Sequence, residues 1–477
     1  MTDIAIHWFR LDLRLRDNPA LRAAAKHSQM IPLYICDTSE PDALKMGGAS
    51  QWWLHQSLMS LNSDLDDQLV IYRGDPEQIL MDIAKQSGAS HVYWNRGYEP
   101  HRINQDMVIK VKLKQRGVNA ISHNGRLLWE PMTVLKADQT PYKVFTPYYR
   151  KGCLSAAEPR YPENAPEHMN CLPKPATSLS IDDLDLSPDI PWYETMEQLW
   201  QPGEQGAADR LSRYINEAAL HYTRDRDIPS VEGTSKLSPH LHFGELSPNQ
   251  IWYAIKDHFR DDSIDNIKSI DKYLAELGWR EFSYYLLYHF PELPTKNVSS
   301  RFDRFPWLDD PTSLRAWQRG MTGIPIIDAG MRELWQTGYM HNRVRMVVGS
   351  FLVKNLLTHW HDGAAWFHDC LLDADLAVNS ASWQWVAGSG ADAAPYFRIF
   401  NPILQGEKFD KDGLYVRKYC PELKDLPNKY IHKPWEAPQE ILKLSGITLG
   451  DDYPQPIVDL KQSRQRALAA FQEIKTA

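Results

Sequence analysis

The sequence has few cysteines and none of the common metal-binding motifs. Its 477 residues include five cysteines, which are scattered without C-x-x-C spacing. This pattern excludes a zinc ribbon and a disulfide framework, and it fits a protein of a reducing compartment. We therefore expect no metal site.

Long apolar runs are also absent. The most apolar stretch near the centre, residues 346–357, is interrupted by Lys354 and Asn355 and is too short to span a bilayer. The first residues carry neither a basic region nor an apolar core of signal-peptide length. We expect a cytoplasmic protein with no part in the membrane.

Basic residues do not outnumber acidic ones. The 53 lysines and arginines stand against 61 aspartates and glutamates, which gives a net charge of −8. This balance offers no general reason to expect nucleic acid, but binding depends on a local basic patch rather than on total charge. Tryptophan, by contrast, is abundant: its 17 copies are unusual in an otherwise ordinary globular composition, with 43% hydrophobic and 24% charged residues.

The first 130 residues lack the glycine-rich turn of dinucleotide-binding folds. Short apolar stretches alternate there with amphipathic ones, which predicts a doubly wound α/β domain with a parallel sheet. The turn after the first strand, residues 10–17, contains no glycine, which argues against a nicotinamide dehydrogenase. The expected strands, all mostly buried, are residues 4–9, 31–35, 69–72, 91–94 and 119–122, and the expected helices are residues 19–25, 49–66, 76–87 and 100–116.

The remaining chain divides into a proline-rich connection and a helical part. Residues 131–205 have no clear periodicity, and ten of the 32 prolines fall between residues 131 and 200, which predicts an ordered linker on the surface. Residues 206–477 have helical periodicity, and Ser238 and Ser247 each precede a proline as expected helix caps. A large all-α domain is therefore expected after the linker.

Polar and aromatic residues concentrate between residues 340 and 402. The centre of this stretch contains Asp373, Asp375, Asn379, Trp383 and Trp385. On a helix, Asp375, Asn379 and Trp383 share one face, while Trp385 points in another direction. This arrangement suits a buried aromatic cofactor with a substrate on its far side, although a tryptophan-rich core helix is the plain alternative.

Three other groups of residues carry possible chemistry. Residues 231–239 place a glycine and hydroxyl groups before a helix, which suits either a phosphate or a simple capped loop. Glu276, Trp279 and Arg280 share one side of a helix, as a surface salt bridge with an aromatic lid or as a surface that reads bases. A basic group either contacts phosphates or pairs in part with neighbouring acids: Arg343, Arg345, Arg398, Lys408, Arg417 and Lys418.

Several motifs together resemble the photolyase/cryptochrome flavoprotein family, and its DNA photolyase branch in particular. They are WFRLDLRLRDNP at residues 8–19, GTSKLSPHL at 233–241, WREF at 279–282, MHNRVRM at 340–346, DADL at 373–376, WQW at 383–385, DAAPYFRIFNP at 392–402 and GEKFD at 406–410. The match covers nearly the whole chain, and several of its strings are long. The resemblance implies an N-terminal antenna domain (residues 1–130), a linker (131–205) and a helical domain (206–477) that holds one non-covalent FAD in a U shape.

The resemblance assigns a set of residues to FAD. Asp373, Asp375 and Asn379 are expected at the isoalloxazine ring, with Arg345 as the partner of Asp373. The amide of Asn379 suits a reduced anionic flavin, whereas plant cryptochromes have an acid at this place. The rest of the cofactor is expected to contact Tyr222, Thr234, Ser235, Lys236, Leu237, Ser238 and Tyr273, the last in place of a tryptophan found in many relatives.

The resemblance also implies a reaction, the light-driven repair of cyclobutane pyrimidine dimers by electron transfer from excited reduced FAD to a flipped-out dimer. The lesion pocket is expected to contain Glu276, Trp279, Asn342, Met346 and Trp385. Asn342 and Met346 take the places of the paired histidines of the (6-4) branch. Electrons are expected to reach FAD through Trp307, Trp360 and Trp383, and DNA phosphates are expected to contact Arg226, Arg280, Arg343 and Arg398.

The expected partners are a second chromophore and UV-damaged DNA. The helix at residues 98–102 has arginine where well-known folate-binding members have glutamate, and QWWLH at residues 51–55 resembles plant cryptochromes and some proteobacterial photolyases. Methenyltetrahydrofolate in another pocket and 8-hydroxy-5-deazaflavin both fit this pattern. We expect a monomer in the bacterial cytoplasm, at the nucleoid when bound to DNA. A cryptochrome photoreceptor without repair activity is the alternative, but the short chain after the helical domain favours repair. A third possibility, a redox flavoprotein, would need a nicotinamide site that the sequence does not show.

Overall fold

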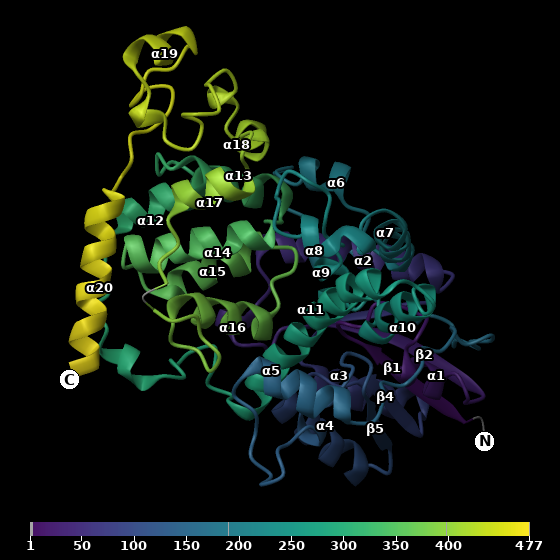
Figure 1. Cartoon of the computed structure of the whole chain (residues 1–477). Helices are drawn as coiled ribbons and strands as arrows, with labels where there is room; N and C mark the ends of the chain where they lie inside the picture. Colours follow the sequence, from purple (N-terminus) through teal and green to yellow (C-terminus); the bar gives the residue numbers. More distant parts are fainter. Residues whose placement is uncertain (1–2, 189, 397, 477) are drawn as a thin grey trace.

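The chain begins with a parallel sheet. The structure, a computed structural model, describes residues 3–188, 190–396 and 398–476. In these residues, five parallel strands form one sheet in the order β3-β2-β1-β4-β5 (Figure 1). The strands are β1 (Ile4–Phe9), β2 (Gln29–Asp37), β3 (Val70–Gly74), β4 (His91–Asn95) and β5 (Asn119–His123).

Strand β1 lies at the centre of the sheet, and the winding of the chain reverses there. In the register of the sheet, Trp8 pairs with Leu33 of β2 on one side and with Trp94 of β4 on the other. Such a reversal opens a crevice beyond the carboxyl ends of the strands, which is where doubly wound folds bind their ligands.

The expected helices flank this sheet. They are α1 (Pro19–Ala24), α2 (Gly48–Asp64), α3 (Pro76–Ser87) and α4 (Pro100–Gln115). Asn18 caps α1, because its side-chain oxygen accepts a hydrogen bond from the amide of Leu21, and a proline follows at the first helical position. Helix α2 is amphipathic, as the sequence pattern of this domain predicts, and Leu54, Leu58 and Leu61 on its apolar face are buried.

Strand β5 differs from the prediction that all strands are mostly buried. It is partly exposed along its length. Its place at the edge of the sheet explains the difference, since β4 is its neighbour on one side and solvent is on the other. The predicted fold class itself is confirmed.

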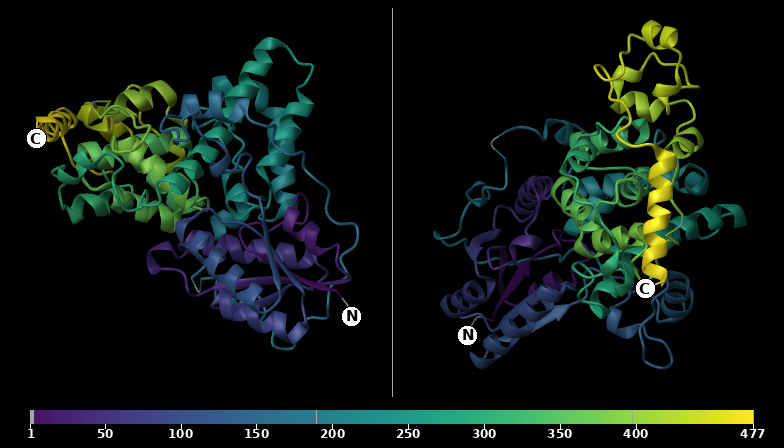
Figure 2. Two further views of the ribbon diagram at one scale, coloured as in Figure 1. Left: turned by 90° about the horizontal axis from the view of Figure 1, so that it is seen from below. Right: turned by 90° about the vertical axis from the view of Figure 1, so that its left-hand side faces the viewer.

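The segment that connects the sheet to the helical part is packed more deeply than the sequence predicts. Figure 2 shows much of it as an extended trace along the outside of the sheet, where the amide of Leu179 donates to the carbonyl of Ile71 (2.9 Å). However, Phe145, Tyr148 and Tyr149 are buried in the core of the helical part. The prediction of a surface linker is wrong for this portion, because its aromatic side chains are stabilised by burial. Its short helices include α5 (Phe145–Pro147) and α6 (Glu194–Leu199).

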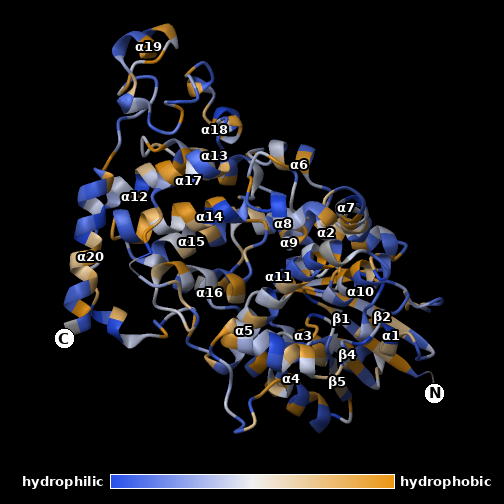
Figure 3. Cartoon of the chain, viewed as in Figure 1, coloured by the Kyte–Doolittle hydropathy of each residue, from blue (hydrophilic) through white to orange (hydrophobic). Residues whose placement is uncertain are grey.

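The rest of the chain is helical around α11 (Ile264–His289) and α16 (Leu376–Ala387), which pack together. Helix α16 also packs against α14 (Asn342–Ser350) and α15 (Trp360–Cys370). Figure 3 shows polar and apolar residues interleaved along the helices, as in amphipathic helices. The further helices are α7 (Glu204–Glu217), α8 (Tyr222–Asp225), α9 (Ser238–Phe243), α10 (Pro248–His258), α12 (Pro311–Gln318), α13 (Pro325–Thr337), α17 (Pro402–Phe409), α18 (Leu414–Tyr419), α19 (Gln439–Leu444) and α20 (Leu460–Thr476).

The two predicted serine caps have different outcomes. Ser247 caps α10 in a reciprocal bond with Gln250, as predicted. Ser238 is not a cap, because α9 begins at Ser238 itself and Leu237 occupies the capping position without a side-chain bond. Within the described residues, none of the helices is both long enough and apolar enough to cross a membrane.

The start of α16 also differs from the prediction. Asp375 lies before the helix rather than inside it, and its carboxylate accepts a hydrogen bond from the amide of Val378 (3.0 Å). Asp375 therefore caps α16, because its carboxylate satisfies an amide of the first helical turn that has no partner within the helix. The predicted single face with Asn379 and Trp383 is wrong in this respect, although all three residues line one cavity.

Candidate active site

A cavity of about 540 Å³ lies in the helical part, where residues of α9, α11, α14 and α16 meet. It is within the usual size range of cofactor sites. The residues expected around FAD line it: Tyr222, Thr234, Ser235, Lys236, Leu237, Ser238, Tyr273, Arg345, Asp373, Asp375 and Asn379. The residues expected around the lesion line it as well: Glu276, Trp279, Asn342, Met346 and Trp385.

Helix α11 contributes a rigid aromatic surface to this cavity. The indole of Trp279 stacks on the ring of Phe145, with a centroid distance of 3.9 Å and an interplanar angle of 11°. Phe145 therefore supports the indole while Trp279 still lines the cavity. A fixed aromatic side chain in a cavity wall is suited to stacking on a planar base.

One helical turn away, Glu276 carries a carboxylate on the same wall. It forms an ion pair with Arg226, and Lys272 lies 3.6 Å away. Burial works against the charge of Arg226, but Glu276 raises its pKa above the ordinary value. The two charges thus compensate each other.

Arg345 and Asp373 form the ion pair that the sequence predicts. Two parallel hydrogen bonds join them, from Nη1 to Oδ1 (3.0 Å) and from Nη2 to Oδ2 (2.9 Å). Arg345 Nε also donates to the carbonyl of Met340 (2.7 Å). This bidentate geometry fixes the guanidinium on the cavity wall.

Asp375 is a buried carboxylate held in its ionised form. Burial would raise its pKa, but His242, at 3.9 Å, the Arg280 guanidinium and the Tyr284 hydroxyl together hold the pKa well below its usual range. His242 Nδ1 is buried and has no hydrogen-bond partner among the described residues. The cavity wall therefore carries an anion at Asp375, with the imidazole of His242 beside it.

Close packing places the remaining residues of α16. Asn379 donates its side-chain amide to the carbonyl of Ala364 (3.0 Å). Trp383 lies against Gly363 of α15, where a Cβ atom would come within 2.1 Å of the indole. Only glycine allows this approach, so the position of the indole in the wall depends on Gly363.

Comparison with known proteins agrees with this geometry. The sequence profile described as the FAD binding domain of DNA photolyase matches residues 273–473, and the profile described as DNA photolyase matches residues 5–167. A deoxyribodipyrimidine photo-lyase of Agrobacterium fabrum is 49% identical over 98% of this chain and 98% of its own length. The chain belongs to the DNA photolyase/cryptochrome family. Cryptochrome-2 of Arabidopsis thaliana is 36% identical, over 99% of this chain and 79% of its own length.

Solved structures of family members have the same architecture. A bacterial class III photolyase from Agrobacterium tumefaciens superposes with a TM-score of 0.94 at 48% identity, covering 100% of this chain and 98% of its own. A Synechocystis cryptochrome superposes with a TM-score of 0.89 at 30% identity, covering 98% and 99%. These findings confirm the resemblance, the fold class and the enzyme class predicted from the sequence, deoxyribodipyrimidine photo-lyase.

The cavity fits the FAD of this family. Hydroxyl groups of Thr234, Ser235 and Ser238 lie along its wall, where a phosphate or a ribityl chain needs hydrogen-bond donors. Asp373 and Asp375 add two acids to the same wall, each with a basic neighbour in the protein. The donors, the acids and the volume are therefore consistent with a flavin nucleotide.

The three tryptophans of the expected electron chain lie in or against one hydrophobic cluster. Trp383 lines the cavity, Trp360 is buried, and Trp307 is half-buried. The imidazole of His359 lies between the outer two, with ring centroids 5.0 Å from Trp307 and 5.8 Å from Trp360. Electron transfer through these three tryptophans stays a prediction.

The four expected DNA-contacting arginines occupy different environments. Arg343 pairs with Asp227 (2.8 Å), and Arg345 pairs with Asp373. For these two residues, the alternative that members of the basic group pair with neighbouring acids applies. Arg398 is exposed, and its neighbour Phe397 in the last motif lies outside the described residues. Arg280 lines the cavity and is only 11% exposed, so it can reach only a nucleotide that enters the cavity.

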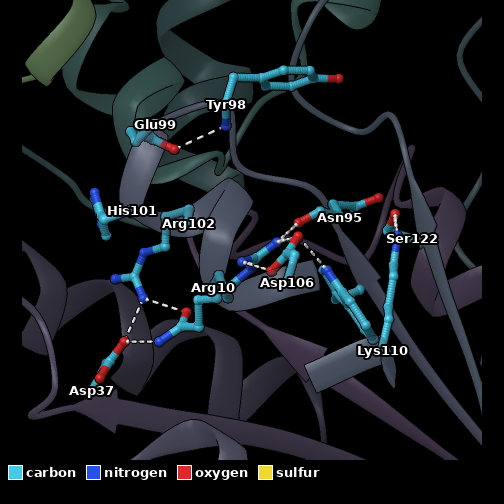
Figure 4. A network of polar contacts seen from close by, with 12 residues as sticks. Arg10, Asp37, Asn95, Tyr98, Glu99, His101, Arg102, Asp106, Lys110 and Ser122 are labelled. Atoms are coloured by element: carbon cyan, nitrogen blue, oxygen red, sulfur yellow. Dashed lines mark hydrogen bonds and ion pairs between the residues drawn. The ribbon is translucent and has the colours of Figure 1, made fainter. Parts of the chain in front are cut away.

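A second cavity, of about 360 Å³, lies at the carboxyl ends of the central strands. Its charged side chains are paired: Arg102 binds Asp37 (2.5 Å), and Arg10 binds Asp106 (2.9 Å) (Figure 4). The arginine that the sequence places in α4 is thus bound to an acid of β2. This cavity occupies the crevice that the reversal of winding at β1 creates.

Among the residues that the structure describes, one group has ligand atoms close enough for a metal ion, namely Asp3, His27 and His91. Each imidazole already has two polar neighbours in the protein. His27 contacts Asp3 (2.7 Å) and Tyr93 (3.0 Å), while His91 contacts Ser90 and Asn119. These hydrogen bonds account for the group, and we assign no ion to it.

Sequence reasoning missed three residues of the main site. Phe145 supports Trp279, Tyr284 donates to Asp375, and His242 lines the cavity. His242 follows the GTSKLSPHL motif directly, so proximity to that motif is a usable signal. Phe145 and Tyr284 carry no local signal, because each acts through a contact that tertiary packing creates.

Proposed function

We propose that this protein repairs cyclobutane pyrimidine dimers in DNA in a light-driven reaction. When bound and reduced, FAD would supply the excited electron that splits the dimer. One observation carries the proposal: the residues expected around FAD and those expected around the lesion line the same cavity. A dimer in that cavity would lie beside the cofactor, close enough for direct electron transfer.

The residues of the cavity suit a dimer that has left the duplex. Trp279 offers a supported aromatic face for stacking, and Glu276 offers a carboxylate to the polar edge of a pyrimidine. Asn342 and Met346 stand where the (6-4) branch has histidines, which favours the cyclobutane dimer as substrate. Extrusion costs little for a lesion that pairs and stacks poorly.

Arg226 links DNA binding to this carboxylate in the proposed reaction. The guanidinium is paired with Glu276 in the structure. When a DNA phosphate replaces Glu276 as its partner, the carboxylate becomes available to the lesion. Arg343 and Arg398 would contact further phosphates, and we propose that a monomer in the cytoplasm acts on UV-damaged DNA in this way.

We propose further that the second cavity holds an antenna chromophore. Trp8 and Tyr34 give it aromatic surface, and it lies where doubly wound folds bind ligands. Methenyltetrahydrofolate and 8-hydroxy-5-deazaflavin are the two candidates. The absorption spectrum of the purified protein distinguishes them, because each absorbs at wavelengths different from those of FAD.

The deciding experiment measures the loss of thymine dimers from an irradiated oligonucleotide under blue light. We expect repair by the reduced protein in light and none in the dark. Glu276→Ala is expected to lower repair per absorbed photon more than it lowers DNA binding, whereas Asp271→Ala, an exposed acid on the same helix, should change neither. A protein that binds FAD and repairs no dimer in single- or double-stranded DNA would instead be a photoreceptor, and the proposal would be wrong.

A further inference from the structure

A buried row of four polar side chains joins the two cavities. Glu99 and Arg126 line the cavity at the sheet, and Asp375 lines the cavity of the helical part (Glu99 is labelled in Figure 4). Arg126 donates to Glu99 Oε1 (3.2 Å) and to the hydroxyl of Tyr284 (2.8 Å). The same hydroxyl hydrogen-bonds to Asp375 Oδ2. The row therefore runs from one cavity to the other without a gap.

Chemistry decides the direction of these hydrogen bonds. A guanidinium only donates, so Tyr284 accepts from Arg126 and gives its single hydroxyl hydrogen to Asp375. The exposed fractions are 9% for Glu99, 6% for Arg126, 0% for Tyr284 and 6% for Asp375. Charges in such an environment are weakly screened, so a change of charge at Glu99 alters the electrostatic potential at Asp375.

The two carboxylates respond to each other across this row. Burial raises the pKa of Glu99, but the Arg126 guanidinium, a backbone hydrogen bond and the Arg102 guanidinium together hold the pKa below its ordinary value. The negative charge of Asp375 opposes this effect at Glu99. The charge of Asp375 in the flavin cavity thus affects the pKa of Glu99 in the sheet cavity.

Asp375 also positions a helix. It caps α16 through the amide of Val378, and α16 carries Asn379, Trp383 and Trp385 in the cavity wall. A change in the hydrogen bonds of Asp375 therefore alters the electrostatic potential at the cofactor, and it also alters the cap at the start of α16.

We propose that Tyr284 is a positioning residue that transmits the charge of the Glu99–Arg126 pair to Asp375 and so tunes the redox potential of the cofactor. This inference rests on the proposed function, because it requires FAD beside Asp375. Loss of the Tyr284 hydroxyl leaves the charge of Asp375 less compensated, which disfavours the reduced anionic cofactor. Loss of the Glu99 charge leaves the positive charge of Arg126 less compensated, which favours the reduced anionic cofactor.

A double-mutant cycle on the FAD-loaded full-length protein tests this coupling. The midpoint potential of FAD is measured in the wild type, Glu99→Gln, Tyr284→Phe and the double variant. We expect Tyr284→Phe to lower the potential and Glu99→Gln to raise it. The shift caused by Glu99→Gln is expected to be smaller once the hydroxyl of Tyr284 is gone.

Tyr285→Phe is the matched control. Tyr285 follows Tyr284 on α11 and is equally buried, but its hydroxyl accepts from the backbone amide of Tyr142 (2.9 Å) in the connecting segment. It is expected to leave the potential unchanged. A shift equal to that of Tyr284→Phe would reveal a general packing effect and would overturn the inference.

Additive shifts, or single variants that do not move the potential, would also overturn the inference. Failure of the proposed function looks different. If the protein binds no FAD, the flavin site is wrong and the inference falls with it. If FAD binds and the cycle is non-additive but dimers are not repaired, the coupling through Tyr284 stands and only the repair reaction is wrong.

Discussion

Replacing Trp279 with alanine removes the aromatic wall of the cavity. The side chain is half-buried on α11, and its indole is held by the Phe145 ring at 3.9 Å. A flipped dimer that enters the cavity is expected to stack on this indole. The variant should therefore lose affinity for dimer-containing DNA rather than affinity for FAD.

The size of the loss follows from the stacking contact. Stacking of a base on an aromatic side chain contributes about 1–3 kcal/mol, so Trp279→Ala should weaken binding on the order of tenfold to a hundredfold. Phe145→Ala leaves the indole in place but removes its support. An aromatic pair of this kind contributes about 0.5–1.5 kcal/mol, so we expect a loss of up to roughly tenfold.

The assay is a titration of an oligonucleotide that contains one thymine dimer, with an undamaged oligonucleotide as reference. Trp252→Phe serves as the control, because Trp252 is buried in the same core and does not line the cavity. Wild-type affinity in Trp279→Ala, with FAD content and melting temperature preserved, would refute the assignment of this indole to the lesion.

Three other predictions concern electron supply, DNA contact and stability. Trp383→Phe should abolish light-driven reduction of oxidised FAD and spare repair by chemically reduced protein; normal photoreduction in absorbance spectra would contradict this role. If Arg226, Arg343 and Arg398 each neutralise one phosphate, the logarithm of DNA affinity should fall against the logarithm of salt with a slope of about −3, whereas a flat titration would argue against these contacts. Burial raises the pKa of Glu281 from 4.5 to about 7, so the wild type loses stability as pH rises between these values. The melting temperature of Glu281→Gln, relative to wild type, should therefore increase from pH 5 to pH 7, and a constant difference would show that Glu281 does not titrate there.

Local signals in the sequence predict much of the fold. Asn18 before Pro19 marks the start of α1, and the spacing of Leu54, Leu58 and Leu61 marks the buried face of α2. These features depend on neighbours within one or two turns, so they can be predicted without knowledge of the tertiary structure.

The arrangement of the site depends on capping and tertiary contacts that cannot be predicted from the periodicity of the sequence. Spacing alone places Asp375 inside a helix, but capping of α16 by its carboxylate moves it outside. Phe145 lies in a proline-rich stretch that resembles a surface linker, and only packing against Trp279 brings it to the cavity. Motif resemblance succeeds where periodicity fails, because it carries information about contacts between distant segments.

The contacts of the connecting segment have a consequence for recombining halves of related proteins. The amide of Phe145 donates to Asp392 (2.7 Å), and its ring stacks on Trp279, so the segment is attached to the flavin half by both backbone and side chain. Just before the segment, the amide of Leu128 donates to Glu281 (2.8 Å). A chimaera whose junction lies at residue 206 would combine a cavity from one parent with an aromatic support from the other. A junction before Leu127 would transfer Phe145 together with the indole that it supports.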